Sequence, residues 1–164
     1  MSTTAVPVSE YLYTDYSPDV DYVDGELEER NVGERDHSRL QALITQYLMN
    51  RERDWAIFVY VEQRIQIAPT RFRVPDIAVV ATRPAAGVIT EPPLLCIEIL
   101  SPEDRATRIQ ARIDDYLNMG VSCVWLVDPA TRRAWIHTPA GSHEAKDGIL
   151  TAGQIRLPLS DIGE

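Results

Sequence analysis

Two apolar runs, each interrupted by a single carboxylate, constrain this chain more than any other feature. The first run is residues 74–80 and contains Asp76, and the second is residues 94–100 and contains Glu98. Both have the length and composition of buried strands. An ionised carboxylate in such a strand is costly unless a cation, a metal ion or hydrogen-bond donors compensate it. We expect the two strands to pair and to bring both acids to one place.

The length and composition are those of one ordinary globular domain. The chain has 164 residues, of which 45% are hydrophobic and 25% are charged, so it can bury a sizeable core. No apolar run is long enough to cross a membrane, and residues 1–7 lack the basic and apolar regions of a signal peptide. We therefore expect a single domain over residues 1–164, in a cytoplasmic protein with no membrane partner.

The cysteines and the charge exclude two further classes of protein. Cys96 and Cys123 fall in predicted core strands, which favours reduced, buried thiols, and no Cys-x-x-Cys spacing supports a zinc site. The net charge of -9 argues against a general nucleic-acid coat protein, which would carry a basic excess. Any contact with phosphate must come from a local cluster of arginines, because Lys146 is the only lysine.

The pattern along the chain predicts an α/β fold of the mixed α+β kind, a central mixed β-sheet flanked by helices. Helices are expected at residues 9–15, 36–53 and 101–120, with Asp36 capping the second and Ser101 capping the third. Strands are expected over the following ranges: 21–29 with a tight turn at Asp24-Gly25, 57–67, 74–80, 94–100, 121–127 and 133–137. Residues 82–93 read as a loop, and residues 138–164 as a C-terminal β arm or loop.

Asp76 and Glu98 each allow a structural explanation and a chemical one. Asp76 could accept hydrogen bonds from nearby backbone at the entry to its strand. Strand alternation places Glu98 on the same face as Cys96 and Leu100, where it could be a core acid paired with an arginine. Together, two carboxylates at one place suit Mg²⁺ or Mn²⁺, which prefer oxygen ligands.

The helix that follows Glu98 carries an arginine stripe. At 100° per residue, Arg105, Arg108 and Arg112 lie along one border of its apolar face, and Arg112 lies closest to the apolar residues. These arginines could pair with sheet carboxylates or with the neighbouring acids 103 and 104. They could instead hold an anionic group or a phosphate at the carboxylate site. His37, in the first turn of the long helix, is better explained as an ordinary polar residue near a helix end.

Several motifs taken together resemble a known family. They are Tyr22-Val23-Asp24-Gly25-Glu26, His37 opening a helix, Val74-Pro75-Asp76, Cys96 to Pro102, Asp114-Asp115-Tyr116, and Gly120-Val121 followed by Val124 to Pro129. They are similar to the restriction endonuclease family catalogued as domain of unknown function 820, in the PD-(D/E)XK nuclease superfamily. The resemblance covers roughly residues 9–140.

The resemblance implies a Mg²⁺-dependent or Mn²⁺-dependent endonuclease acting on DNA. By position, Asp76 and Glu98 would be the metal-binding acids, and Glu26 would match the acid of the early Gly-Glu motif. The superfamily's lysine, two residues after the Glu, is Leu100 here. In this family a lysine often stands four residues before the tyrosine, and that position holds Arg112. Arginine can stabilise a phosphate, but it cannot serve as a general base.

The sequence supports two functions of different kinds. The first is an endonuclease in which Asp76 and Glu98 bind the metal, Glu26 completes the acidic shell, and Arg112 contacts phosphate with Arg105 and Arg108. The second is a catalytically inactive nuclease-fold protein that serves as an interaction or assembly module, with Glu98 and Arg112 forming a buried salt bridge. An exposed strand edge and the C-terminal arm are also compatible with a homodimer.

Overall fold

The computed structural model describes residues 4–30 and 34–163. The elements are α1 (Val8–Leu12), β1 (Asp21–Val23), β2 (Glu26–Glu28), α2 (Arg35–Met49), α3 (Glu52–Trp55), β3 (Phe58–Val61), β4 (Ile65–Ala68), β5 (Arg71–Arg73), β6 (Ile77–Val80), β7 (Leu95–Ile99), α4 (Ala106–Met119), β8 (Cys123–Val127), β9 (Ala134–Thr138), β10 (Gly141–Glu144), β11 (Ile149–Ala152), β12 (Ile155–Pro158) and the 3₁₀ helix η1 (Leu159–Ile162). No helix in the described part of the chain is both long enough and apolar enough to span a membrane.

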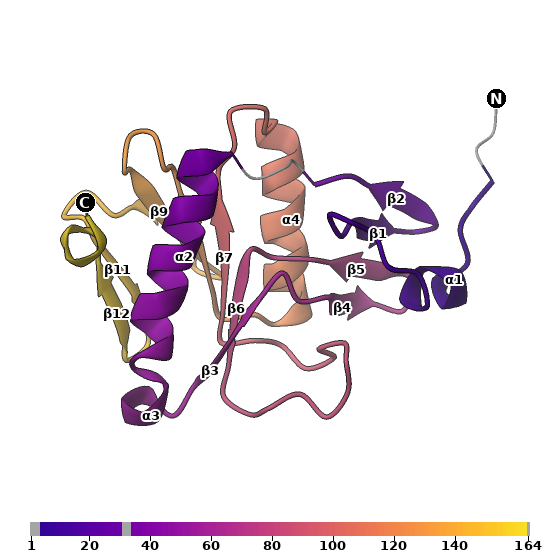
Figure 1. The fold of residues 1–164 in the computed structure, drawn as a ribbon, viewed down its shortest axis with the longest axis horizontal. Coiled ribbons are helices and arrows are strands. Elements are labelled where there is room, and N and C mark those ends of the chain that lie inside the picture. Colours follow the sequence, from indigo (N-terminus) through magenta and orange to yellow (C-terminus); the bar gives the residue numbers. More distant parts are fainter. Residues whose placement is uncertain (1–3, 31–33, 164) are drawn as a thin grey trace.

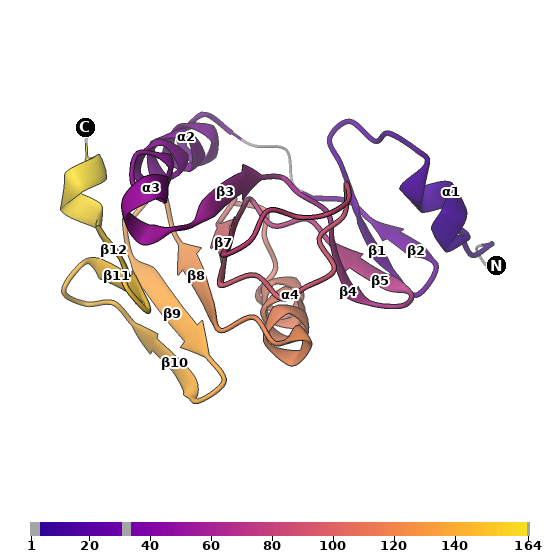
Figure 2. The same ribbon diagram turned by 90° about the horizontal axis from the view of Figure 1, so that it is seen from below.

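A mixed sheet flanked by helices forms the centre of the molecule, which confirms the predicted fold class. The six-stranded sheet has the order β10-β9-β8-β7-β6-β3, and its strands pair antiparallel except for the parallel pair β7 and β8. Helices α2 and α4 lie on opposite faces of this sheet (Figures 1 and 2). A four-stranded sheet of order β2-β1-β5-β4 lies at one end, and the C-terminal strands β11 and β12 lie at the other.

Strand alternation sorts the core residues between the two helices. The face that meets α2 carries Ile97, Ile99 and Trp125, which cluster with Leu40 and Ile44 of that helix. The opposite face carries residues such as Cys96 and Val124, which cluster with residues of α4. Each face therefore buries its own apolar layer, as expected for a sheet covered on both sides. Because Glu98 shares the face of Cys96, its side chain is directed toward α4.

The small sheet is held by an aromatic cluster at the N-terminal end. Tyr11 of α1 contacts the rings of Tyr22 and Phe72, with centroid distances of 5.1 and 5.3 Å. All three side chains are buried. The turn at Asp24-Gly25, where both residues have positive φ, closes the β1–β2 hairpin as predicted. This packing fixes the hairpin and strand β5, which carry charged residues toward the central sheet.

Both predicted helix caps were wrong. The N-cap of α2 is Glu34, and Asp36 lies in the first turn, where its carboxylate pairs with Arg35 at 2.9 Å. Helix α4 begins at Ala106, several residues after Ser101. The Asp104 carboxylate accepts the Ser101 backbone N–H at 2.7 Å, and the Asp104 N–H donates to the Ser101 carbonyl. This local turn competes with helix formation, so the helix starts later.

The predicted strand over residues 57–67 is two strands in two different sheets. Glu62 has a positive φ of 48°, which breaks the extended run after β3. Strand β3 then forms an edge of the large sheet, while β4 belongs to the small one. Similarly, the run over residues 74–80 becomes strand only from Ile77, so Asp76 stands immediately before β6. This position frees its side chain from the strict alternation of a strand.

Candidate functional site

Glu98 lies in β7, and Asp76 lies immediately before β6, the strand that pairs with β7. Ile77 of β6 is opposite Ile97 of β7 in an antiparallel register, which places Asp76 across from Glu98. The Ile99 backbone N–H donates a hydrogen bond of 2.7 Å to Asp76 Oδ2, so the two strand ends are also joined through this carboxylate. The register therefore places the two residues opposite each other, and the charge of Asp76 is one of the influences that raise the pKa of Glu98.

The Asp76 carboxylate is buried and surrounded by donors. Besides the Ile99 N–H, it accepts a hydrogen bond from Arg30 Nη2 at 2.9 Å and faces His37 Nε2 at 3.4 Å. Burial alone would raise the pKa of Asp76, but the hydrogen bond from His37 and the charges of His37 and Arg30 outweigh it and lower the pKa. Conversely, the pKa of His37 is raised, because its contact with Asp76 outweighs the effect of burial. Asp76 is thus held as an anion.

Glu98 has a less compensated environment. Its Oε1 atom accepts hydrogen bonds from Tyr116 Oη at 2.6 Å and from Arg112 Nη2 at 2.9 Å. Burial raises the pKa of Glu98 to about 7, although the nearby Arg112 acts in the opposite direction. Both hydrogen bonds that Glu98 accepts from described side chains are on Oε1. Oε2 is therefore the oxygen of this carboxylate with lone pairs available to a cation.

Arg112 points inward, as its position beside the apolar stripe predicted. Its guanidinium donates to Glu98 and to the Val74 carbonyl, both at 2.9 Å, and lies 3.4 Å from Asp21. Only 16% of its side chain is exposed. The positive charge of Arg112 is thus directed at Glu98.

A second arginine, Arg73, joins the β1–β2 hairpin to α4. Its guanidinium contacts Asp21 at 3.1 Å, Glu28 at 2.9 Å and Asp115 at 2.8 Å, and its side chain is 4% exposed. Asp21 also accepts the Val74 backbone N–H at 2.9 Å. We call Asp21, Arg73, Glu98, Arg112 and Asp115 the buried charge network. In this network negative and positive side chains alternate, in the order Glu98, Arg112, Asp21, Arg73 and Asp115.

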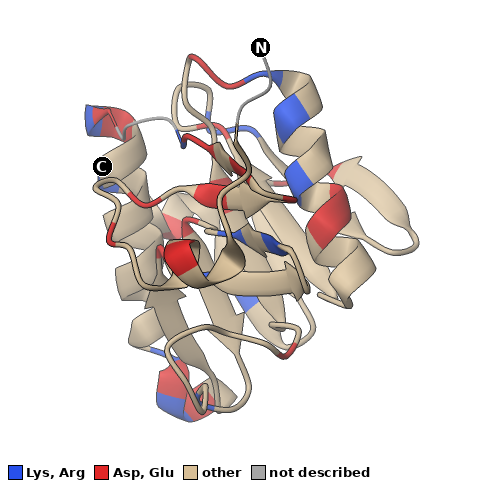
Figure 3. Ribbon diagram, turned by 90° about the vertical axis from the view of Figure 1, so that its right-hand side faces the viewer, with Lys and Arg blue, Asp and Glu red and all other residues tan. Residues whose placement is uncertain are grey.

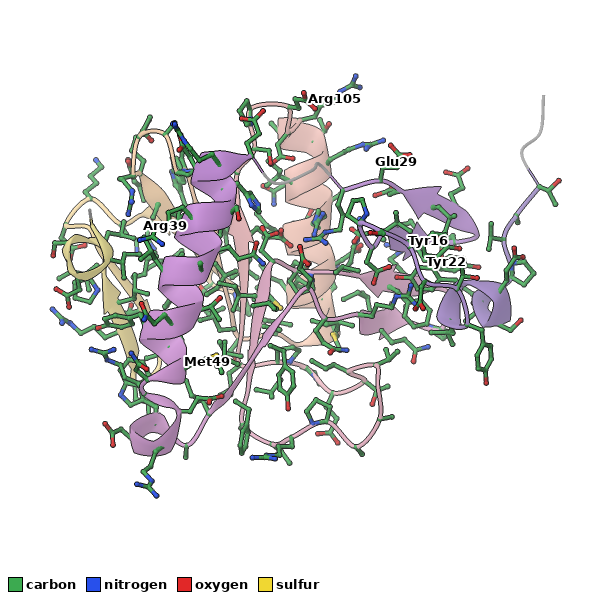
Figure 4. All side chains as sticks on the ribbon, viewed as in Figure 1. Tyr16, Tyr22, Glu29, Arg39, Met49 and Arg105 are labelled. Carbon is green, nitrogen blue, oxygen red and sulfur yellow. The ribbon has the colours of Figure 1, made fainter. Side chains whose placement is uncertain are left out.

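The three arginines expected to bind phosphate line one cavity of about 400 Å³, which we call the arginine cavity. Its walls are formed by Asp21, Glu28, Glu29, Glu103, Asp104, Arg105, Arg108, Ile109 and Arg112. Figure 4 shows Arg105 at the start of α4 and Glu29 after β2, at the same end of the molecule. Acidic and basic residues are interspersed around this end of α4 (Figure 3). The cavity adjoins Glu98 through Arg112.

Glu26 does not lie near Asp76 and Glu98, the two acids of the candidate site. It is exposed, lies opposite Val23 in the hairpin, and makes no contact with Asp76 or Glu98 in the described structure. Glu28, two residues further along β2, is the acid of this strand that reaches the site, through Arg73. Glu26 and Glu28 lie on the same side of β2, because side chains alternate along a strand.

His37, Arg30 and Arg73 also contact the site acids, and the sequence alone did not predict this role for them. A signal for His37 was present, because it lies three residues before Leu40 on the buried stripe of α2 and so faces the sheet. No comparable signal existed for Arg73, whose partners are at least 42 residues away along the chain. In the described part of the chain, no group of three or more acidic, histidine or cysteine side chains forms a ready metal cluster.

Comparisons with known proteins assign this chain a family and a fold. A family model named Uma2 and described as "Putative restriction endonuclease" matches residues 9–160. The chain also resembles a solved structure described as "a putative nuclease belonging to DUF820 from Anabaena variabilis ATCC 29413". The TM-score is 0.82 at 22% sequence identity, over 94% of this chain and 95% of that one. At this identity the structural likeness establishes the fold. A search of curated proteins found no match.

Proposed function

We propose that this chain, which belongs to the Uma2 family of restriction endonuclease-like proteins, is a divalent-metal-dependent endonuclease that hydrolyses DNA phosphodiester bonds. One observation carries the proposal. Glu98, which lies across from Asp76, accepts a hydrogen bond from Arg112, and Arg112 is one of the three arginines that line the arginine cavity. A nuclease needs this pairing of metal-binding oxygens with cations for the phosphate.

The donor set fits Mg²⁺ or Mn²⁺. Mg²⁺ is usually bound by one or two carboxylates, with water and substrate phosphate completing its coordination. Asp76 and Glu98 supply two carboxylates, and the Glu98 Oε2 atom is available for this purpose. A divalent ion held there would supply Lewis-acid stabilisation of the negative charge on phosphate.

The protein's own groups would bind the phosphate, stabilise its charge and orient the Glu98 carboxylate. Water adds to phosphorus and releases one proton to solvent, the bond from phosphorus to the leaving sugar oxygen breaks, and that oxygen takes up a proton from solvent. Arg112 stays charged at all working pH values, so it can stabilise the negative charge on the phosphate but cannot take a proton from water. Tyr116 and Arg112 both bond to Glu98 Oε1 and so fix the orientation of the carboxylate. Arg105 and Arg108 would bind neighbouring phosphates.

The test is cleavage of supercoiled plasmid by the pure protein with Mg²⁺ or Mn²⁺. Asp76→Asn and Glu98→Gln should each abolish cleavage while preserving side-chain volume. Glu144→Gln is the matched control, because Glu144 also pairs with an arginine, at 2.7 Å from Arg133, but on the surface. Metal-dependent cleavage that persists in both site variants would contradict the proposal. Arg112→Lys should retain activity, since it restores the family's residue, whereas Arg112→Gln should lose it.

A second function is favoured by the ion pairs themselves. Arg112 contacts Glu98 and Arg30 contacts Asp76, each at 2.9 Å, so both acids already have a cation. The chain would then be a catalytically inactive scaffold that keeps the fold as an interaction module. Titration calorimetry with Mn²⁺ separates the two functions. Stoichiometric binding that Glu98→Gln removes would count against the scaffold, and no binding at millimolar Mn²⁺ would support it.

A further inference from the structure

Arg30 forms a buried ion pair with Asp76 inside the candidate site. Its side chain is only 8% exposed, and its Nη2 atom donates a hydrogen bond of 2.9 Å to Asp76 Oδ1. The other oxygen, Oδ2, accepts the Ile99 backbone N–H at 2.7 Å and faces His37 Nε2 at 3.4 Å. Both oxygens of this carboxylate therefore have partners, and the partner of Oδ1 is a long, flexible side chain.

This ion pair conflicts with metal binding at Asp76. A guanidinium 2.9 Å from the oxygen that binds a divalent ion would lie beside a like charge, which is unfavourable at such a distance. Oδ2 is the less accessible oxygen, because the N–H that it accepts belongs to the backbone of β7 and cannot move away. A divalent ion at Asp76 would thus bind to Oδ1 and compete with Arg30.

Glu62 gives Arg30 a second carboxylate at short range. Arg30 Nη1 lies 3.8 Å from Glu62 Oε1, so one guanidinium already spans the two acids. The Glu62 backbone N–H donates to the Asp76 carbonyl at 3.1 Å, which keeps the two residues together. The Glu62 side chain is 54% exposed, whereas that of Asp76 is 5% exposed. A small movement would therefore transfer Arg30 from a buried carboxylate to a solvated one.

The charge balance gives a reason for such a transfer. A buried carboxylate is costly without a cation, and Arg30 reduces this cost at Asp76. Its charge also acts on Glu98: burial is the largest influence on the pKa of Glu98 and raises it, and the charge of Arg30 is among the influences that lower it. Arg30 therefore supplies part of the positive charge that a divalent ion would supply at both acids.

We propose that Arg30 competes with the divalent ion for Asp76: it pairs with Asp76 Oδ1 until an ion binds there, and it then pairs with Glu62. This inference rests on the proposed nuclease function and concerns the control of the same site. The metal affinity is lowered by the charge-assisted hydrogen bond that each ion must displace. The same hydrogen bond stabilises the fold without metal. Arg30 thus raises stability and lowers metal affinity.

The first experiment measures both effects in the full chain. The Kd for Mn²⁺ is measured by titration calorimetry, and stability by urea unfolding in EDTA, for the parent and Arg30→Gln. Arg30→Gln should lower the Kd by about tenfold to a hundredfold, the equivalent of one charge-assisted hydrogen bond, and should lower the urea midpoint. An unchanged or higher Kd would overturn the inference, because a residue that only supports the fold does not oppose metal binding.

Two further variants show that the gain in affinity belongs to this contact. Asp76→Asn, added to Arg30→Gln, should remove the gain, because the ion then lacks the carboxylate. Arg64→Gln is the matched control: the Arg64 side chain is 13% exposed and pairs with Asp19 at 2.8 Å, but in the described structure it contacts neither site acid. It should lower the urea midpoint without lowering the Kd, and an equal fall in Kd would contradict the proposal.

Glu62 provides an arm that changes only an exposed side chain. Glu62→Gln should raise the Kd for Mn²⁺ by roughly twofold to fivefold, as for an exposed ion pair, because Arg30 loses its alternative partner. In the Arg30→Gln background the same change should have little effect. A general effect of the Glu62 charge on the ion would be equal in both backgrounds, and that result would contradict the transfer. Glu91→Gln, which removes an exposed carboxylate between β6 and β7, should leave the Kd unchanged.

The outcomes separate this inference from the nuclease function. A lower Kd in Arg30→Gln, with no plasmid cleavage by either protein, would support the competition and refute the nuclease. Cleavage by the parent, with equal Kd values for the two proteins, would support the nuclease and refute the competition. Absence of Mn²⁺ binding by both proteins would refute both. If both hold, Arg30→Gln should reach half-maximal cleavage at a lower Mn²⁺ concentration than the parent.

Discussion

Replacing Arg73 by methionine should destabilise the protein more than any surface substitution. The arginine is 3% exposed and contacts three carboxylates, of which Asp21 is 1% exposed and Asp115 is 7% exposed. Methionine fills a comparable volume but leaves these buried charges with fewer partners. Removing one member of a buried ion pair costs about 3–5 kcal/mol, because the remaining charge is left uncompensated.

The structure places the expected loss at the lower end of this range. Asp21 keeps Arg112 at 3.4 Å, and Asp115 keeps Arg71 at 2.8 Å, so neither acid loses its last cation. We therefore expect a loss of about 3 kcal/mol. This is a large fraction of the roughly 5–15 kcal/mol that a domain has in total. For a chain of this size it corresponds to a decrease in Tm of about 6–12 °C.

The assay is urea unfolding at pH 7.5, followed by tryptophan fluorescence, since Trp125 is fully buried in the core. Arg133→Met is the matched control. The Arg133 side chain is 58% exposed in its pair with Glu144, so its loss should destabilise the protein far less than the loss of Arg73. Similar losses for the two variants would refute the view that the buried charge network stabilises the fold. A double-mutant cycle of Arg73→Met with Asp115→Asn should give a coupling energy above about 1 kcal/mol.

Three further predictions concern other parts of the molecule. Gly120→Ala should lower the free energy of unfolding in urea by about 1–3 kcal/mol, because Gly120 has φ +113° and an added Cβ would lie 3.2 Å from Pro92. Gly148→Ala should lower it less, because an added Cβ there meets no atom within 4 Å. A larger loss for Gly148→Ala than for Gly120→Ala would contradict this prediction. Cys123 should resist iodoacetamide in the native protein at pH 8 but react in urea, as judged by mass spectrometry. Burial raises the pKa of Cys123 to about 11, which leaves only about 0.1% of it as thiolate at this pH. Rapid labelling of Cys123 in the native protein would refute this prediction. Glu98 binds a proton more tightly in the folded state, so its contribution to stability is fully present below its ordinary pKa of 4.5 and is lost as the pH rises through about 7. In metal-free buffer, the stability of Glu98→Gln should therefore rise relative to that of the parent between pH 5 and pH 8. A difference in unfolding free energy between the two proteins that stays constant over this range would argue against the raised pKa.

Local patterns predicted much of the fold and part of the candidate site. Period-two alternation placed Glu98 on the face of Cys96, and the structure directs it to α4. Helical periodicity placed Arg112 beside the apolar stripe, and the structure directs it to Glu98 at 2.9 Å. These predictions succeeded because the periods of strands and helices fix which side chains share a face.

The failures occurred where a side chain competed with the backbone or where the contact was distant in sequence. Asp104 bonds to the Ser101 N–H and delays the start of α4, which composition alone does not reveal. His37 faces Asp76, which is 39 residues further along the chain, and helix position alone suggested an ordinary polar residue. Glu26 has the motif position of a site acid, yet the hairpin register leaves it exposed and brings Glu28 to Arg73 instead.

The sequence by itself determined that two strands would each bury one acid and that an arginine-bearing helix would follow them. Those features depend on local periodicity and on the cost of burying charge. The tertiary structure decided which partners compensate each acid: Arg30 and His37 for Asp76, and Arg112 and Tyr116 for Glu98. It also decided that Arg73 joins distant carboxylates into one network. Electrostatic compensation depends on distance in space, and only the packed arrangement of the sheets and helices fixes that distance.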